Sequence, residues 1–316
     1  MRVSWDACSG KSRRKLWIRR GMEREHLHRV FWDAHVGKER RREKNPFKRV
    51  HTDLVWLEIA PFVEPGLRVL DAGGGYGRYS VALAREGCQV VHLDLSPRML
   101  EEARKIARRE GVEQRMTFVL GKVQDLSAFT DQAFDLVISL DAPVSYAYPS
   151  EKQALRELCR VTRGTLIVSV VNRLGQLPVA LEVEARWRKD FALSRKFLEE
   201  GNWDHPPFFQ AMEEKIPLLS RLLFPPLHAF LPMELVNEVE SSGFRVQRVV
   251  ATGTLSRLVS PRTLRRIVRN PKLYEEFLKL SHWYDAHFEV LGVGSRVASG
   301  LLVVARREGE HHAGVV

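Results

Sequence analysis

Short apolar segments alternate with amphipathic helical patterns along much of this chain. Five segments of this kind, each four to seven residues long, read as buried strands, and they lie at residues 68–71, 89–94, 116–120, 134–140 and 165–171. Helical patterns separate them, and Ser96, Pro97 and Gly111 mark the start and the end of one helix. A further short helix is expected at residues 51–62. Strands separated by helices predict a parallel sheet with right-handed crossovers.

The alternation stops after the fifth strand and resumes later. Residues 172–231 are rich in Trp, Phe and Pro, and they include a helical pattern at 181–199. Beyond them we expect helical stretches at residues 232–242 and 261–290, and strands at residues 245–251 and 300–306. The pattern predicts an α/β fold with a doubly wound, mostly parallel seven-stranded sheet, and a helical insertion between strands 5 and 6. An insertion of this length is expected to have its own structure, and we interpret it as a substrate lid.

Positive charge is concentrated at the start of the chain. The net charge is +11, and the first 50 residues hold sixteen Lys and Arg against six Asp and Glu, so the remainder is nearly neutral. This basic arm either binds phosphates, as in nucleic acid, or is a solvated tail. Met22 is an alternative start for the chain. The expected organisation is an arm at 1–50, a core at 51–171, the insertion at 172–231, and completion of the core at 232–316.

Composition excludes several classes of protein. No apolar run approaches the roughly 20 residues of a membrane helix, and no apolar stretch follows the basic start as in a signal peptide. The three cysteines, Cys8, Cys88 and Cys159, lack a metal-binding spacing. We therefore expect a cytoplasmic protein without a metal site. The sequence does not determine the oligomeric state.

A glycine-rich motif after the first strand carries the main chemical signal. Asp71 ends that strand and is followed by Gly73, Gly75 and Gly77, in the pattern D-x-G-x-G-x-G. Glycines between a strand and a helix allow a tight turn and a close approach to a ligand. A pyrophosphate at the helix start would be repelled by the adjacent carboxylate. S-adenosylmethionine carries an ammonium and a sulfonium instead, so the motif favours this cofactor. Asp94 ends the second strand, near the spacing of about 20 residues expected for a ribose-binding acid.

These features resemble the class I, Rossmann-like methyltransferases across residues 51–172 and 232–306. The resemblance implies that Asp71 and the three glycines hold the methionine part of S-adenosylmethionine and that Asp94 holds the ribose. Leu95 would then pack on the adenine, and the backbone of Leu140 would face the cofactor. The family's adenine-binding acid is absent from Gly121-Lys122-Val123. The neighbouring residues Gln124 and Asp125 are the alternatives.

The sequence indicates the methyl acceptor less clearly than the cofactor. Asp141, Ser145 and Tyr146 would line the way to the methyl group, His228 would point into the cleft, and Arg257 is a candidate for a substrate carboxylate. No catalytic residue can be assigned, because the sulfonium already activates the methyl group and a base is needed only for some acceptors.

Three functions remain open. The first is a methyltransferase acting on a small molecule. The second is a tRNA methyltransferase, because residues 70–75, Gln124-Asp125 and the tail at 291–306 are similar to those of enzymes that modify wobble uridines. The third is a nucleotide-binding protein without transfer activity.

Overall fold

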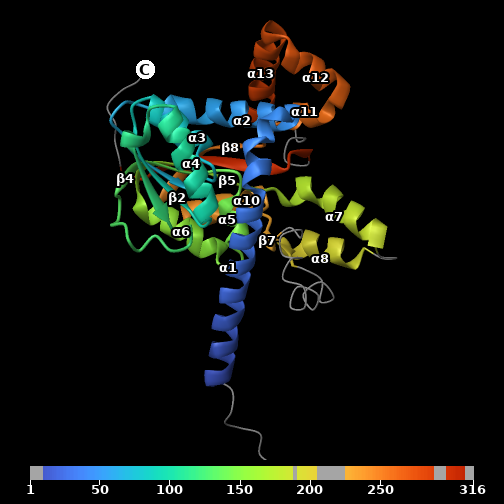
Figure 1. Ribbon diagram of the computed structural model, residues 1–316. Helices are drawn as coiled ribbons and strands as arrows, with labels where there is room; N and C mark the ends of the chain where they lie inside the picture. Colours follow the sequence, from blue (N-terminus) through green and yellow to red (C-terminus); the bar gives the residue numbers. More distant parts are fainter. Residues whose placement is uncertain (1–9, 188–190, 205–224, 288–296, 310–316) are drawn as a thin grey trace, which may run out of the picture.

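The computed structural model describes residues 10–187, 191–204, 225–287 and 297–309 (Figure 1). At its centre is a seven-stranded sheet in the order β3-β2-β1-β4-β5-β9-β8. The strands are β1 (Arg68–Ala72), β2 (Gln89–Asp94), β3 (Met116–Leu120), β4 (Phe134–Ser139), β5 (Thr162–Val171), β8 (Phe244–Val250) and β9 (Gly300–Arg307). β9 is antiparallel to both of its neighbours, β5 and β8, and the other neighbouring pairs in this sheet are parallel. The predicted fold class, a mostly parallel seven-stranded sheet, is therefore confirmed.

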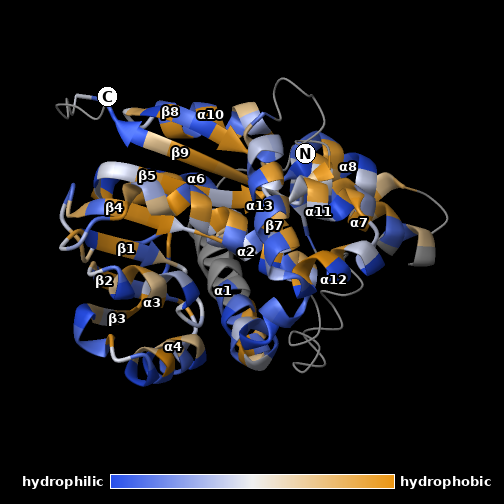
Figure 2. Ribbon diagram, turned by 90° about the horizontal axis from the view of Figure 1, so that it is seen from above, coloured by the Kyte–Doolittle hydropathy of each residue, from blue (hydrophilic) through white to orange (hydrophobic). Residues whose placement is uncertain are grey.

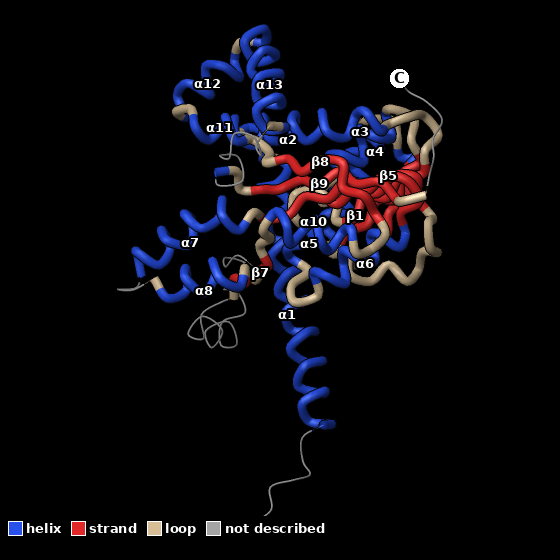
Figure 3. Tube along the Cα trace, turned by 180° about the vertical axis from the view of Figure 1, so that it is seen from behind, coloured by secondary structure: helices blue, strands red, loops and turns tan. Residues whose placement is uncertain are grey.

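Helices cover both faces of this sheet (Figure 3). On one face lie α2 (Pro46–Ile59), α3 (Arg78–Arg85) and α4 (Pro97–Arg109), and on the other α5 (Pro143–Tyr146), α6 (Glu151–Val161) and α10 (Pro232–Glu240). Successive side chains along a strand point to opposite faces of the sheet. Val69 packs on the first side and Leu70 on the second. The strands are mainly hydrophobic (Figure 2), as expected for a sheet buried on both faces.

The described part of the amino-terminal arm is helical rather than a tail. Helix α1 (Gly10–Arg40) is 31 residues long, and its second half packs beside α4 while its first half extends away from the core (Figure 1). Arg40 pairs with Glu102 at 3.1 Å, and Ser96 Oγ donates a hydrogen bond to Asp33. Helix α2 begins at Pro46, earlier than predicted, because the Asn45 side chain caps it by accepting from the Phe47 backbone N–H.

Among the residues that the structure describes, the insertion contains two helices and a small β-ribbon. They are α7 (Arg173–Trp187), α8 (Ala192–Glu200), β6 (Asn202–Trp203) and β7 (Leu227–His228). The single helix expected at 181–199 is wrong, because Phe191 is not helical and the chain turns back there. The Glu184 carboxylate accepts hydrogen bonds from the Leu193 and Ser194 backbone N–H groups and so caps α8. Residues 205–224 of the predicted lid lie outside the described residues.

Between β8 and the last strand, the described residues form three named helices. They are α11 (Thr254–Leu258), α12 (Pro261–Arg269) and α13 (Pro271–Ala286). The expected single stretch at 261–290 is divided, because Asn270 ends α12 and its side chain caps α13. Together with α2, α12 and α13 form a separate apolar cluster around Leu54, Leu264 and Phe277. In the part of the chain that the structure describes, no helix is long and apolar enough to cross a bilayer.

Candidate functional site

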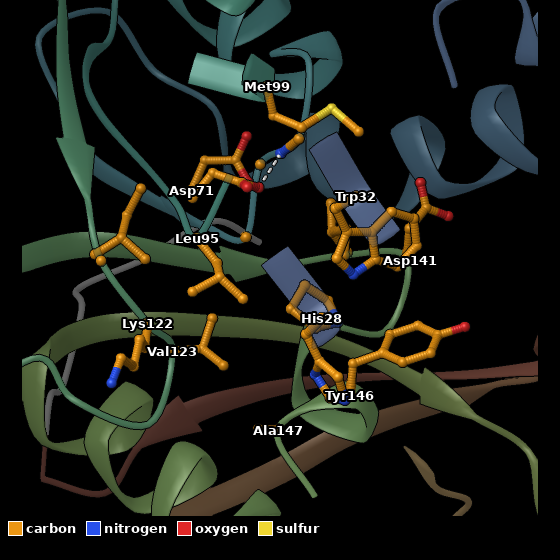
Figure 4. Close-up of a pocket in the computed structure, with 18 of the residues that line it drawn as sticks. His28, Trp32, Asp71, Leu95, Met99, Lys122, Val123, Asp141, Tyr146 and Ala147 are labelled. Atoms are coloured by element: carbon orange, nitrogen blue, oxygen red, sulfur yellow. Dashed lines mark hydrogen bonds between the residues drawn. The ribbon is translucent and has the colours of Figure 1, made fainter. Parts of the chain in front are cut away.

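A cavity of about 350 Å³ lies at the carboxyl ends of β1, β2 and β4. Its floor is the loop between β1 and α3 together with the ends of β2 and β4, and α1 lies across it (Figure 4). In open parallel sheets, ligands bind at this edge, where the strand order reverses. Of the predicted cofactor residues, seven border the cavity: Asp71, Gly73, Gly75, Asp94, Leu95, Gln124 and Leu140.

The glycine loop has different requirements at its successive positions. Gly73 has φ +80°, and a Cβ there would lie 2.4 Å from Cγ of Pro143. Gly75 has φ +58°, and a Cβ there would meet no atom within 4 Å. Hydrogen bonds fix this loop, since the Gly73 and Gly74 N–H groups donate to the Leu93 carbonyl at 2.7 and 3.1 Å. Gly73 is therefore required by packing, whereas Gly75 leaves room in the cavity for a ligand.

Gly77 does not border the cavity, contrary to the role that the resemblance implied. It has φ +86° at the start of α3, and a Cβ there would lie 2.9 Å from Cβ of Ala103 in α4. Its place is at the contact between the two helices, where a side chain would push them apart.

Asp71 is a buried carboxylate with one unsatisfied oxygen. Ser80 Oγ donates to Oδ2 at 2.6 Å, whereas Oδ1 has no hydrogen-bond partner among the described residues. Burial raises the pKa of Asp71 to about 7, and the neighbouring Asp94 adds to this rise. His92 lies 4.0 Å away, but burial lowers its pKa to about 4, so it is neutral and does not compensate the charge. A cationic ligand group would therefore be stabilised beside Asp71, as the cofactor ammonium requires.

Asp94 links the glycine loop to the end of β2. Its carboxylate accepts from the Gly75 and Ser96 backbone N–H groups, both at 2.8 Å. Burial raises the pKa of Asp94 to about 6, and these hydrogen bonds partly offset that rise. Each oxygen keeps a second acceptor position, so a ribose diol can still donate to it. Leu95 and Met99 border the same end of the cavity and offer apolar surface for a flat ring.

The structure distinguishes between Gln124 and Asp125, the two alternatives for the contact with adenine. Gln124 borders the cavity. Asp125 does not, because its exposed carboxylate accepts from the Ser127 hydroxyl at 2.7 Å. The sequence did not indicate that Lys122 also borders the cavity and pairs with Glu25 of α1 at 2.5 Å.

The predicted acceptor residues divide into two groups. Asp141 and Tyr146 border the cavity. Ser145 is buried and accepts from the Val171 backbone N–H at 2.9 Å, so it ties α5 to β5. His228 is buried. Its Nδ1 lies 2.7 Å from Oδ1 of Asn202, and its Nε2 lies 2.8 Å from Oε1 of Glu234 in α10. Arg257 lies on the exposed side of α11, away from the cavity. The last three positions are therefore corrections to the predicted site.

Asp141 is the centre of an ionic cluster that sequence reasoning missed. Its carboxylate lies 2.6 Å from Arg42, 3.2 Å from Arg78 and 3.2 Å from His51. These groups outweigh burial and hold the pKa of Asp141 well below its usual range. Asp141 and Ala142 have φ of +63° and +72°, a conformation that is costly for residues with a Cβ. Arg42 belongs to the basic arm, for which a solvated tail was one expectation. In the structure it is largely buried, because it spans from the end of α1 to Asp141.

Aromatic side chains from α1 and α5 form the wall opposite Leu95 and Asp71 (Figure 4). The Trp32 and Tyr146 rings meet edge to face with centroids 5.4 Å apart, and His28 meets Tyr146 edge to face at 6.5 Å. All three residues border the cavity. The described residues of the insertion do not border it, although Tyr148 of the cavity wall donates to Asp204 at 3.2 Å. Among the described side chains, no group of three or more His, Cys, Asp or Glu could hold a metal ion.

Comparison with known proteins identifies this arrangement. Residues 63–212 match the model of a family described as "Methyltransferase domain". The chain contains a class I methyltransferase domain. Its cofactor is S-adenosylmethionine, and the unsatisfied Asp71 oxygen and the space above Gly75 fit this ligand. The family match includes β1 to β5 but not α1.

The curated relatives resemble only part of the chain. The tRNA 5-carboxymethoxyuridine methyltransferase of Escherichia coli K12 is 37% identical over 86 residues, which are 27% of this chain and 32% of that protein. Magnesium-protoporphyrin O-methyltransferase of Rhodobacter capsulatus is 31% identical over 123 residues, 39% of this chain and 53% of that protein. The chain thus spans about a third to a half of the length of these two relatives.

Solved structures agree on the fold. Magnesium protoporphyrin IX methyltransferase of Synechocystis PCC 6803, with bound S-adenosylhomocysteine, has a TM-score of 0.53 and 17% identity, over 90% of this chain and 100% of that one. An S-adenosylmethionine-dependent methyltransferase of Mesorhizobium loti has a TM-score of 0.50 and 20% identity, over 80% of this chain and 98% of that one.

Cofactor binding by this domain is expected to depend on pH through Asp71. A carboxyl with a raised pKa is preferentially protonated in the ligand-free fold, and the ligand ammonium favours its ionised form. The affinity for S-adenosylhomocysteine should therefore rise about tenfold between pH 6 and pH 8, as expected for a pKa near 7. Calorimetry at several pH values measures this change. In Asp71→Asn the rise should be much smaller, and an equal rise in that variant would assign the dependence to another group.

Proposed function

We propose that this protein transfers the methyl group of S-adenosylmethionine to a small-molecule acceptor. The acceptor would bind between α1 and the segment from Asp141 to Tyr148. The observation that carries this proposal is the position of α1. Glu25 and Trp32 of α1, and Arg42 just after this helix, border the cavity from above, so the acceptor side is partly covered. A nucleotide within a folded RNA would have to displace this helix, whereas a small planar molecule can bind beneath it.

The described residues suit methyl transfer by alignment. The bound cofactor supplies an activated methyl group, and the protein must orient the acceptor and exclude water. Asp71, Asp94 and the glycine loop would fix the donor. Trp32 and Tyr146 offer flat apolar surface against which an aromatic acceptor can pack. His28 borders the same space and would be a proton acceptor for a hydroxyl substrate.

A tRNA substrate is the second candidate, because positive charge is not confined to the amino-terminal arm. Helix α12 exposes Arg262, Arg265, Arg266 and Arg269 and contains no acidic residue. The chain beyond residue 50 is nearly neutral in net charge, but this helix gathers four exposed arginines in one place. Exposed arginines in such a row can contact phosphates. The partial similarity to a tRNA methyltransferase also favours a tRNA substrate.

A labelling experiment separates the two candidates. The protein is incubated with methyl-labelled S-adenosylmethionine and either total tRNA or the fraction below about 1 kDa of a deproteinised cell extract. We expect label in the small-molecule fraction, which mass spectrometry can then identify. The Gly75→Val variant, expected to lose the cofactor, is the matched control. Label transferred to tRNA but not to the small molecules would overturn the small-molecule proposal and favour the second candidate.

A further inference from the structure

Positive charge is in excess on the surface of α11, α12 and α13. Within residues 257–287, seven exposed Lys and Arg stand against two exposed acids. These acids, Glu275 and Glu276, both pair with Lys279, at 2.9 and 3.0 Å. Helix α12 contains no acid, and none of its exposed arginines forms an ion pair with another described residue: Arg262, Arg265, Arg266 and Arg269. This surface is therefore available to an anionic partner.

Large apolar side chains are exposed beside these cations. Four of them, with 45–57% of their surface accessible, are Leu258, Leu273, Leu280 and Trp283. Leu258 lies four residues before Arg262, and Leu273 four residues after Arg269, so an exposed leucine lies close to an arginine at each end of α12. Leu280 and Trp283 follow Leu273 at intervals of seven and three residues, which places all three on one side of α13.

The exposed sides of α12 and α13 are not used to hold the helices in place. Their opposite sides carry Leu264 and Phe277, which pack with Leu54 of α2 in a separate apolar cluster. Both helices project beyond α2 and the sheet (Figures 1 and 3). Exposed apolar residues that gather on one surface, bordered by polar ones, mark an interaction site.

An anionic phospholipid bilayer matches both properties of this surface. Guanidinium groups bind lipid phosphates, while Leu and Trp side chains enter the boundary between headgroups and acyl chains. An RNA backbone would pair with the arginines, but its phosphates and sugars offer no apolar phase for the leucines. The combination of charge and apolar exposure therefore favours lipid over RNA for this surface.

We propose that α11, α12 and α13 bind the surface of an anionic phospholipid bilayer. The arginines of α12 contact the headgroup phosphates, and Leu273, Leu280 and Trp283 of α13 enter the interface. None of the residues 257–287 borders the cofactor cavity. The inference is therefore independent of the proposed methyl transfer, and each can fail without the other.

Co-sedimentation of the full chain with lipid vesicles tests the proposal. Vesicles of phosphatidylcholine alone are compared with vesicles that also contain phosphatidylglycerol, and we expect binding only to the second kind. An arginine near an anionic surface contributes roughly fivefold in affinity, so a variant with all four arginines of α12 replaced by Gln should bind roughly a hundredfold more weakly or worse. Leu273→Gln combined with Leu280→Gln should weaken binding roughly tenfold, because these side chains no longer enter the interface.

Two matched controls remove the same groups elsewhere on the surface. Helix α4 also exposes four arginines, and their replacement by Gln removes the same charge: Arg98, Arg104, Arg108 and Arg109. Leu198→Gln with Met233→Gln replaces two exposed apolar residues on α8 and α10. Both controls should bind anionic vesicles within about threefold of the unaltered protein. Calorimetry should give the same affinity for S-adenosylhomocysteine in every variant, which also shows that each is folded.

Several outcomes would overturn the proposal. Among them are no binding of the unaltered protein to anionic vesicles, and an equal loss in the α4 control, which would indicate net charge alone. Binding that depends on the arginines but not on the leucines would do the same, and tRNA titrated into these variants would then identify RNA as the partner. A dimer in sedimentation velocity that Leu273→Gln with Leu280→Gln abolishes, without vesicle binding, would assign the surface to a second copy of the chain.

Discussion

A protein that begins at Pro46 is expected to lose S-adenosylhomocysteine binding, whereas one that begins at Met22 keeps it. The first truncation removes Glu25, Trp32 and Arg42, which cover the cavity, and the second retains all three. We expect a loss of roughly a hundredfold or more in affinity, about 3 kcal/mol. The loss arises because the shorter protein lacks these side chains and leaves that side of the cavity open to water. Calorimetry on the two proteins measures it.

The fold should survive this truncation. None of the four apolar clusters includes a residue of α1, and the sheet with its covering helices begins after residue 45. Circular dichroism and thermal unfolding check this point. If the Pro46 protein unfolds, the full chain carrying Glu25→Gln, Trp32→Ala and Arg42→Met removes the same contacts without removing α1. Normal cofactor affinity in either folded protein would show that α1 does not contribute to the site.

This experiment also separates the two roles first considered for the basic arm. Residues 1–21 carry seven Lys and Arg and one Asp, so the Met22 protein loses most of the arm's excess charge. RNA binding through these cations would fall steeply with their removal and with salt. Cofactor affinity would not, since the residues that border the cavity begin at Glu25. The charge at the start of the chain and the cavity cover thus belong to different parts of the arm.

The part of the site that lies at strand ends could be predicted from the sequence. Asp71 and Asp94 end two apolar segments, and the carboxyl ends of parallel strands meet at one edge of the sheet. The glycines between a strand and a helix located the loop in the same way. These inferences depend on local patterns and a fold rule, so they needed no knowledge of side-chain packing.

The cover of the cavity could not be predicted in this way. Helix α1 is rich in charged residues on all sides, which is typical of a solvated helix. The contacts that hold it over the cavity are long-range: Glu25 reaches Lys122, and Arg42, just after the helix, reaches Asp141. Nothing in the local sequence distinguishes Arg42 from the exposed Arg41 beside it. Neighbours on α5 illustrate the same limit, because Tyr146 borders the cavity whereas Ser145 bonds to β5.

Gly75→Val is expected to lose cofactor binding while the protein stays folded. The Gly75 N–H donates to Asp94, and its carbonyl lies 3.1 Å from His92 Nε2, so the loop is held in its left-handed conformation. A valine side chain would meet no protein atom within 4 Å at its Cβ, and it would occupy space in the cavity. We expect the affinity for S-adenosylhomocysteine to fall roughly a hundredfold or more, about 3 kcal/mol. Calorimetry or a thermal shift with the ligand measures the loss.

The substitution also strains the backbone, and Gly111→Val is the control for that effect. Gly111 has φ +70°, a Cβ there would likewise meet nothing within 4 Å, and it lies after α4, away from the cavity. Both variants should lose about 1–3 kcal/mol of folding free energy, because valine is disfavoured in this conformation. Only Gly75→Val should lose the ligand, since only its side chain enters the cavity. Equal ligand affinity in the two folded variants would mean that Gly75 serves the turn alone and that the cofactor lies elsewhere.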